Sequence, residues 1–109
     1  MGDEVGSYAE FWPVYLRAHS RPGNRRLHAV GTGLGLALLA GAALTGDWRL
    51  VPAAVVLGYG FAWAGHFLVE GNRPATFGHP LWSLFSDFRM LGLMLAGRLR
   101  GELDRADIR

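Results

Sequence analysis

The chain has 109 residues, half of them hydrophobic, which is enough for one domain. It has no cysteine, so disulfides and thiolate metal sites are excluded, and metal ligands would have to be His, Asp or Glu. Its 11 basic side chains are all arginines, and they flank apolar runs as in membrane proteins. We therefore predict one membrane-embedded helical domain over residues 1–109. Its predicted partner is the lipid bilayer, and we predict that it binds no nucleic acid.

The first predicted element is an amphipathic helix over residues 7–20. Ser7 and Glu10 have the spacing of a capping box, so the helix should begin at Tyr8. Aromatic and leucine side chains then recur at intervals of three and four, which places them on one helix face. Such a face either lies at a membrane interface or packs inside a small bundle.

Two long apolar runs follow, and we predict that they are membrane spans at residues 25–46 and 48–70. Residues 29–46 carry no charge over 18 positions, which is about the length that crosses a bilayer core. Gly31 and Gly35 are four residues apart, a spacing that lets another helix approach closely. The two runs therefore predict a helical hairpin.

The orientation of this hairpin follows from its charges. Asp47 and Trp48 lie in the predicted turn, as a cap and an interface anchor. Arginines instead gather beyond the other ends of the two spans, with only Arg49 at the turn. The positive-inside rule then places both ends of the hairpin in the cytoplasm.

The last predicted helix covers residues 80–99 and is only partly embedded. Pro80 suits the first helical position. Asp87 and Arg89 interrupt the apolar run, and the arginines that follow would lie outside if the helix spanned the bilayer. We expect an interfacial helix, with a third span as the alternative, and an exposed charged tail at residues 101–109. The predicted fold class is an all-α integral membrane helical bundle.

Folding the hairpin at Asp47 brings distant histidines to the same depth. His28 and His66 each lie 19 residues from Asp47, which is about 28 Å along a helix. His19 and His79 lie just outside the spans, so all four histidines can converge. Neutral imidazoles with a carboxylate suit Zn, Fe, Mn or Ni, and a His-rich site with open positions suits non-haem Fe(II). The alternative is four ordinary interfacial histidines, and spacing alone does not identify a metal.

Polar and aromatic residues around His66 complete a candidate site. Glu70 lies four residues later and should share the same helix face. Tyr59 and Trp63 continue that face toward the membrane. The arrangement predicts a polar mouth above an apolar channel, which suits an amphiphile whose head reaches the ligands while its tail stays in lipid.

Other polar residues have two interpretations each. Arg73 either anchors to lipid phosphates or holds a substrate carboxylate. Asp87 either orients a ligand histidine from behind or pairs with an arginine. Asn24 is a candidate helix cap as well as a ligand contact. The candidate substrate contacts are Asn24, Tyr59, Trp63, Asn72 and Arg73.

The order His19-x4-Asn24-x3-His28, followed by Gly65-His66-x3-Glu70-x2-Arg73-Pro74-Ala75, resembles a family of small membrane proteins associated with 2-hydroxy fatty acid dioxygenase activity. The segment TFGHPLWSL at residues 76–84 looks like the short bacterial branch of that family. The resemblance implies an Fe(II)-dependent enzyme of a bacterial inner membrane, which uses O2 to shorten a 2-hydroxy fatty acid by one carbon. It also implies histidine ligands to the iron, and the matching positions are His19, His28, His66 and His79.

Glu70 also matches a shared position of the family, where it would act either as a metal ligand or as a residue that supports the ligands. We expect Glu70 and Arg73 to be catalytic, with Arg73 holding the substrate carboxylate. A haem protein with two axial histidines stays open from the residues alone, and so do two other functions. One is a Zn-dependent membrane lipid hydrolase on the same site, and the other is a lipid-binding membrane protein without enzymatic activity. The glycine-rich spans also suit a homodimer.

Overall fold

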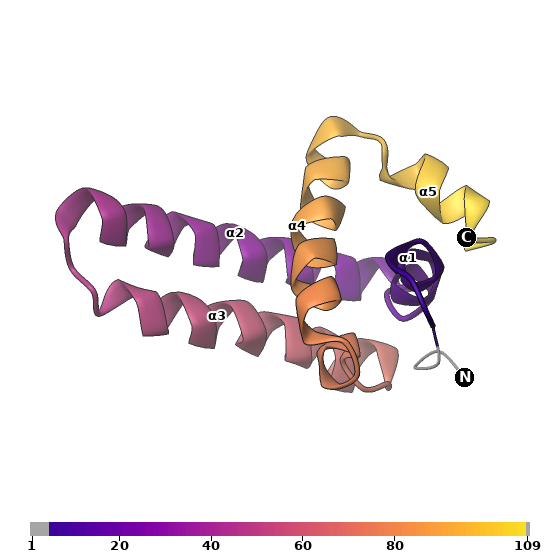
Figure 1. Ribbon diagram of the computed structural model, residues 1–109, viewed down its shortest axis with the longest axis horizontal. Helices are drawn as coiled ribbons and strands as arrows, with labels where there is room; N and C mark the ends of the chain where they lie inside the picture. Colours follow the sequence, from indigo (N-terminus) through magenta and orange to yellow (C-terminus); the bar gives the residue numbers. More distant parts are fainter. Residues whose placement is uncertain (1–4, 109) are drawn as a thin grey trace.

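The structure is a computed structural model that describes residues 5–108, and these residues contain helices and no strand (Figure 1). Five α-helices, one π-helix (η2) and one 3-10 turn (η3) follow each other as α1 (Tyr8–Arg17), α2 (Pro22–Thr45), α3 (Leu50–Ala64), η2 (Gly65–Glu70), η3 (Ala75–Phe77), α4 (Pro80–Ala96) and α5 (Leu99–Arg105). The predicted all-α class is confirmed.

Helices α2 and α3 form the predicted hairpin, and Figure 1 shows the other helices gathered at its open end. The two backbones approach closely at Gly31. A Cβ atom added there would lie 2.8 Å from Phe61 Cβ and 2.9 Å from the carbonyl oxygen of Gly58. Such distances leave no room for a side chain, so the small-residue spacing predicted to admit a neighbouring helix is confirmed, with α3 as that neighbour.

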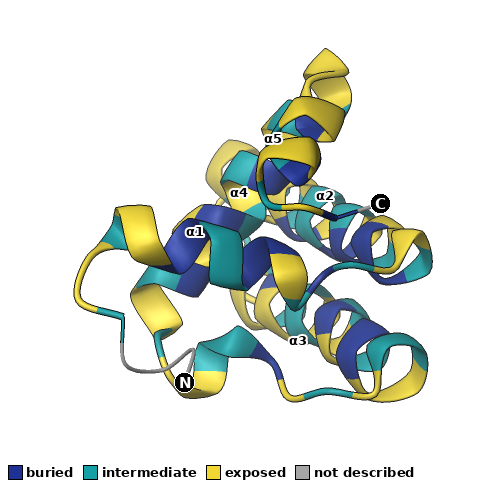
Figure 2. Ribbon diagram, turned by 90° about the vertical axis from the view of Figure 1, so that its right-hand side faces the viewer, coloured by how far each residue is buried: buried dark blue, intermediate teal, exposed yellow. Residues whose placement is uncertain are grey.

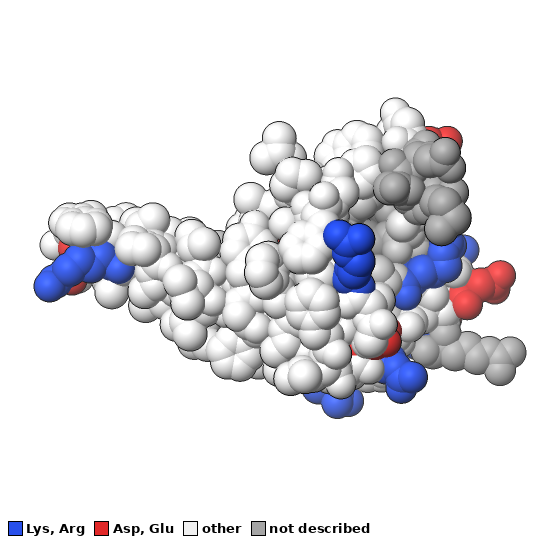
Figure 3. Space-filling view, turned by 90° about the horizontal axis from the view of Figure 1, so that it is seen from below, with Lys and Arg blue, Asp and Glu red and all other residues white. Residues whose placement is uncertain are grey.

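The hairpin has an apolar surface along most of its length. Leu44 is 87% exposed and Val56 is 69% exposed, although both are large hydrophobic side chains. Figure 3 shows charged side chains at the two ends of this face and uncharged ones between them. Pro22–Thr45 and Leu50–Glu70 are long and apolar enough to cross a membrane, and within the described residues they are the two helices that meet this test.

One face of helix α1 packs against the rest of the protein. Ser7 caps it, because its hydroxyl accepts a hydrogen bond from the backbone N–H of Glu10 at 3.3 Å, so the predicted start at Tyr8 is confirmed. The helix ends at Arg17, three residues earlier than predicted. Its buried face joins α4 and the C-terminal residues in one core, visible as dark segments in Figure 2, made of Phe11, Trp12, Tyr15, Leu16, Met90, Leu99, Leu103 and Ile108.

The C-terminal residues correct one prediction. The exposed tail predicted from residue 101 is helical up to Arg105, and only Arg109 lies outside the described residues. Leu103 and Ile108 are buried in the core, and Glu102 accepts a hydrogen bond from Trp12 Nε1 at 2.8 Å. The exposed tail was predicted from the charged residues alone. That prediction overlooked the leucines at positions 99 and 103, whose spacing of four gives the helix an apolar face.

Helix α4 is shorter than the predicted 80–99. It starts at Pro80, as expected for a proline in the first turn, and stops where Gly97 adopts a left-handed conformation with φ of 71°. The N-terminus of α2 also differs from prediction, because Pro22 occupies the first turn and Asn24 lies inside the helix instead of capping it.

Candidate metal centre

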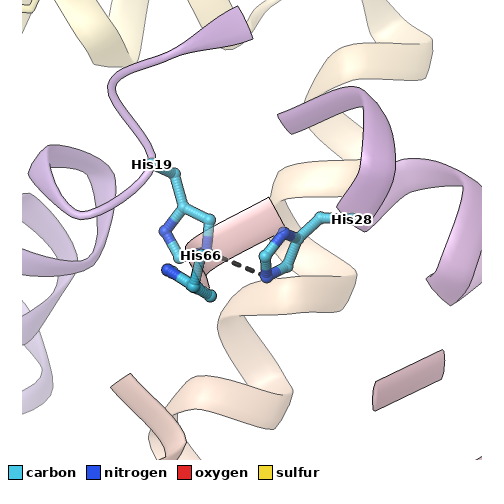
Figure 4. A group of neighbouring side chains, drawn as sticks. All are labelled: His19, His28 and His66. Atoms are coloured by element: carbon cyan, nitrogen blue, oxygen red, sulfur yellow. Dashed lines mark hydrogen bonds between the residues drawn. The ribbon is translucent and has the colours of Figure 1, made fainter. Parts of the chain in front are cut away.

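Three of the four histidines meet at the open end of the hairpin. His19 follows α1, His28 lies on α2 and His66 lies on η2, and one ring nitrogen of each lies within 4.8 Å of the other two (Figure 4). All three side chains are almost completely buried, at 1–3% exposure. Residues 47 positions apart in the sequence thus form one histidine cluster, as the hairpin geometry predicts.

The loop between α1 and α2 is folded so that His19 faces the hairpin. Arg25 Nη1 donates hydrogen bonds to the carbonyl oxygens of His19 and Ser20 at 2.7 and 2.9 Å. A buried guanidinium that satisfies two backbone acceptors holds this short loop against α2. Neither Arg25 nor its partners could be assigned from the sequence, because the contact depends on the loop conformation.

In two of the three histidines, a backbone carbonyl oxygen determines which ring nitrogen carries the hydrogen. His19 Nδ1 lies 2.7 Å from the carbonyl oxygen of Tyr15, and His28 Nδ1 lies 3.2 Å from that of Asn24. A carbonyl oxygen can only accept, so each Nδ1 carries the hydrogen and donates it. Both acceptors lie four residues before their histidine, which is the carbonyl that the preceding turn leaves nearest.

The side chain of Asn72 determines which ring nitrogen of His66 carries the hydrogen. Its Nδ2 donates to the carbonyl oxygen of Ala18 at 3.0 Å, which identifies Oδ1 as the atom that faces the ring. That oxygen accepts a hydrogen bond from His66 Nδ1 at 2.7 Å. Asn72, predicted as a substrate contact, therefore orients a histidine and ties it to the α1–α2 loop.

These hydrogen bonds leave the three Nε2 atoms as unprotonated lone-pair donors. His19 Nε2 and His28 Nε2 are 3.0 Å apart, with no hydrogen available between them (Figure 4). Two nitrogens bound to one ion at about 2.0–2.1 Å, with bonds near a right angle, are roughly 3 Å apart. A cation would turn this contact between two lone pairs into coordination, so the donor set fits a metal ion.

The protonation state of His19 agrees with this role. Burial, and then the neighbouring rings of His28 and His66, hold the pKa of His19 well below its usual range. The ring is therefore neutral at pH 7, which is the form that binds metals.

Glu70 lies at the N-terminus of α2, outside the histidine cluster. Its carboxylate accepts hydrogen bonds from the backbone N–H of Arg21 at 2.6 Å, from Ser20 Oγ at 3.2 Å and from Asn24 Nδ2 at 3.3 Å. A carboxylate at a helix N-terminus satisfies free N–H groups and complements the helix dipole. These contacts show a capping role, while its catalytic role stays a prediction.

His79 is not part of the cluster. It immediately precedes α4, where its ring stacks on Trp82 at a centroid distance of 5.0 Å and meets the edge of Phe11 at 5.2 Å. Its Nε2 atom is buried without a hydrogen-bond partner among the described residues. The predicted convergence of four histidines is thus reduced to three in the structure.

Two hollows adjoin the cluster. The histidine cavity is lined by His28, His66, Trp63, Pro74, Ser83 and Asp87, and its volume of about 10 Å³ is roughly that of one water site. The outer cleft, of about 360 Å³, is open and is lined on one side by Arg73, Pro74, Phe77 and His79. Pro74 lines both hollows, so a thin wall separates the surface from the buried rings.

The predicted substrate contacts are spread over these surroundings. Arg73 lies over the Phe77 ring at 5.3 Å, and Trp63 meets the edge of that ring. Tyr59 lies one turn away on α3, while Asn24 is fully buried between α2 and η2. A Cβ atom on Gly65 would lie 2.0 Å from Asn24 Oδ1, so this asparagine sits where only glycine leaves space.

Asp87 and Tyr15 form a second layer behind the cluster. The Tyr15 ring stacks on His19 at 4.1 Å, and its hydroxyl donates a hydrogen bond to Asp87 Oδ1. Burial raises the pKa of Asp87 to about 6, although the Tyr15 hydrogen bond opposes the shift. Tyr15 is one of the aromatic residues on the face predicted for the first helix, and its position four residues before His19 is the sequence signal for this contact.

A family model described as 2-hydroxy-palmitic acid dioxygenase Mpo1-like matches residues 5–99. No curated protein and no solved structure matches the chain. Because the family model covers most of the chain, the protein belongs to the Mpo1-like family, and the resemblance seen in its histidine motifs is confirmed.

Proposed function

We propose that this member of the Mpo1-like family is a membrane-embedded iron(II) dioxygenase that shortens a 2-hydroxy fatty acid by one carbon. His19, His28 and His66 would hold the metal. The observation that carries the proposal is the buried cluster of three imidazoles, which have one ring nitrogen each within 4.8 Å of the others and whose orientations are fixed through Nδ1. Metal-binding histidines commonly donate their second N–H to a carbonyl or carboxylate, which sets the tautomer and the ring orientation.

Iron(II) bound by three imidazoles would supply the activation of dioxygen and keep open positions for other ligands. One 2-hydroxy acid and one O2 balance to one acid that is a carbon shorter, one carbon dioxide and one water. The bond between C1 and C2 breaks, and the four electrons lost by the substrate are accepted by O2. This stoichiometry needs no further reductant.

The side chains of the protein prepare this reaction by binding and orientation. Arg73, on the rim of the outer cleft, is placed to attract a carboxylate from the aqueous side. Asn72 and the carbonyl oxygens of Tyr15 and Asn24 keep the three rings from rotating. Burial of the cluster excludes bulk water, which favours controlled use of O2.

The bilayer completes the site. We infer that the hairpin α2–α3 is embedded in a membrane, with its open end and the histidine cluster at the cytoplasmic face, because exposed leucines and valines cover the hairpin and arginines flank its open end. A 2-hydroxy fatty acid in the cytoplasmic leaflet would then have its head at the depth of the cluster and its chain beside the hairpin.

The test uses purified protein in lipid nanodiscs with Fe(II) and 2-hydroxypalmitate. We expect O2 uptake matched by pentadecanoic acid, with no uptake for palmitate, which lacks the hydroxyl group. His66→Ala in the same nanodiscs is the matched inactive control. Absence of both O2 uptake and the odd-chain acid in the wild-type protein would overturn the proposed activity.

Three imidazoles also suit zinc, so the metal needs its own measurement. Elemental analysis of protein purified without chelators should find iron at about one equivalent per chain. Zinc as the resident metal, with ester hydrolysis and no O2 uptake, would instead support the lipid hydrolase alternative.

A further inference from the structure

An apolar groove lies where α4 crosses the hairpin. Its floor contains Gly31 and Gly35 from α2, and its walls include Leu36, Leu84 and Phe88. The volume is about 80 Å³, and carbon atoms provide most of its lining. Gly31 and Gly35 contribute backbone atoms of α2 to the groove, and the leucines and the phenylalanine line its sides.

The groove lies next to the histidine cavity. Asp87 on α4 lines both hollows, and Ser83, one turn earlier on the same helix, lines the cavity beside His28 and His66. Residues four apart lie on one helix face, so this side of α4 runs from the metal centre to the groove. The polar end of a chain that lies in the groove would therefore be close to the histidine cavity.

The Ser83 hydroxyl indicates what such a molecule offers. The side chain is 2% exposed, and its Oγ atom has no hydrogen-bond partner among the described residues. Burying a hydroxyl without a partner is costly, so buried hydroxyls in folded proteins nearly always have one. A polar group of a ligand in the histidine cavity would provide it.

We propose that the groove holds the alkyl chain of the 2-hydroxy acid and that Ser83 Oγ contacts its head. This assignment rests on the proposed function for the identity of the acid. A membrane lipid that merely filled the groove would leave Ser83 unpartnered, whereas a 2-hydroxy acid brings one head oxygen to the cavity, whose volume is about that of one water site, and methylenes to the groove. From Gly31 to Leu39 the α2 side of the groove is about 12 Å long, so a longer chain extends past Leu39 into lipid.

Leu84→Trp tests the groove by filling it from the α4 side. We expect kcat/KM for 2-hydroxypalmitate to fall by about tenfold while that for 2-hydroxyoctanoate changes by less than about threefold, because only the longer chain meets the new ring. Leu95→Trp is the matched control, since Leu95 lies on the same helix, is 80% exposed and lines none of these hollows. Equal effects on both substrates, or none on either, would refute the groove.

Ser83→Ala tests the head contact. We expect KM for 2-hydroxypalmitate to rise by about tenfold with metal content unchanged. The thermal stability of the ligand-free protein should stay the same or increase, because no protein contact is lost. An unchanged KM, or a loss of stability, would show that the hydroxyl serves the fold and not the substrate.

A third experiment does not depend on turnover. Metal-free protein in nanodiscs is irradiated with a 2-hydroxy fatty acid that carries a mid-chain diazirine, and the labelled residues are found by mass spectrometry. Labels on Leu36, Leu84 or Phe88 support the groove even if the protein shows no O2 uptake, which would count only against the proposed function. Turnover with labels confined to Leu95 and the lipid-facing hairpin would refute the groove and leave the activity standing.

Discussion

The two halves of the α2–α3 hairpin are built from similar apolar sequences but have different interiors. Near the turn, large side chains such as Leu44 and Val56 face outward, and the side-chain polar contacts are those of Thr45, Asp47 and Arg49. At the open end, Asn24 and three histidines, from the α1–α2 loop, α2 and η2, are almost fully buried.

This difference shows how the protein tolerates buried polar groups. Near the turn the helices need only close backbone contact, and a bilayer would solvate their outer surfaces. At the open end each imidazole has a carbonyl or amide oxygen at its Nδ1 atom, so the cost of burial is offset on one side of each ring. The unprotonated side of each ring is left for a ligand.

The largest expected effect is loss of the metal centre. His28→Ala removes one of three nitrogen ligands, and we expect bound iron to fall below about a tenth of an equivalent and dioxygenase activity to fall by more than about 100-fold. Leu44→Ala, near the turn, should retain both. Iron content by elemental analysis and O2 uptake measure the contrast, and a His28→Ala protein with full iron content would show that the two halves differ only in packing.

Removing the support of one ligand should have a smaller effect. Asn72→Ala leaves His66 in place but frees its Nδ1 atom, so we expect the metal affinity to fall by about 10–100-fold. A titration with Co(II), followed by its visible absorption, gives the affinity and the ligand geometry. Asn72→Asp, which keeps an acceptor at the same position, should restore much of the loss; identical weakening in both variants would argue against an orienting role.

Alanine substitutions at two glycines should differ in their effect on the stability of the protein, because the two glycines differ in how tightly they are packed. Gly65→Ala places a Cβ atom against Asn24, so we expect a loss of about 1–3 kcal/mol in the free energy of unfolding. Gly33→Ala is the matched control on α2, because nothing lies within 4 Å of its added Cβ atom, and it should be neutral or stabilising by up to about 1 kcal/mol. Denaturant titrations in detergent compare the two, and equal destabilisation would contradict the difference in packing.

The smallest expected effect concerns Glu102, which connects α5 to α1 through its hydrogen bond with Trp12. Its pKa is lowered, first by the hydrogen bond from Trp12 and then by Arg105 and Arg89. A lowered pKa in the folded state means that ionised Glu102 stabilises the fold above pH 4.5 and that this contribution disappears as the pH falls through the folded-state pKa. Glu102→Gln should cost less than about 1 kcal/mol at pH 7, and this cost should shrink as the pH is lowered below 4.5, as measured by unfolding over a series of pH values.

Much of the fold was predictable because it depends on local patterns. Uncharged runs of bilayer length indicated the hairpin, Ser7 and Glu10 marked the start of α1, and the spacing of Gly31 and Gly35 indicated a close helix contact. Helix α5 was missed because its apolar face appears only as two leucines among charged residues, and such a short helix depends on packing against α1.

The candidate site was predictable only in its residue types and depth. Counting residues from Asp47 brought His28 and His66 to one level, and the motifs added His19. What each imidazole contacts depends on loop conformation, so the role of Asn72 and the separate position of His79 could not be read from spacing. Glu70 was expected beside His66, but it reaches the N-terminus of α2.

Because Gly65–Glu70 is a π-helix, the orientation of the residues that follow it depends on the number of residues in this segment. A π turn holds one residue more than an α turn, so the helix changes phase at this point, with exposed apolar residues such as Val56 before it and Asn72, which contacts the α1–α2 loop, after it. Deleting Leu68 would restore an ordinary turn and rotate everything beyond it by about 100° relative to α3. Small insertions and deletions should therefore be rare at this position among functional relatives, whereas the turn between the two long helices can vary in length.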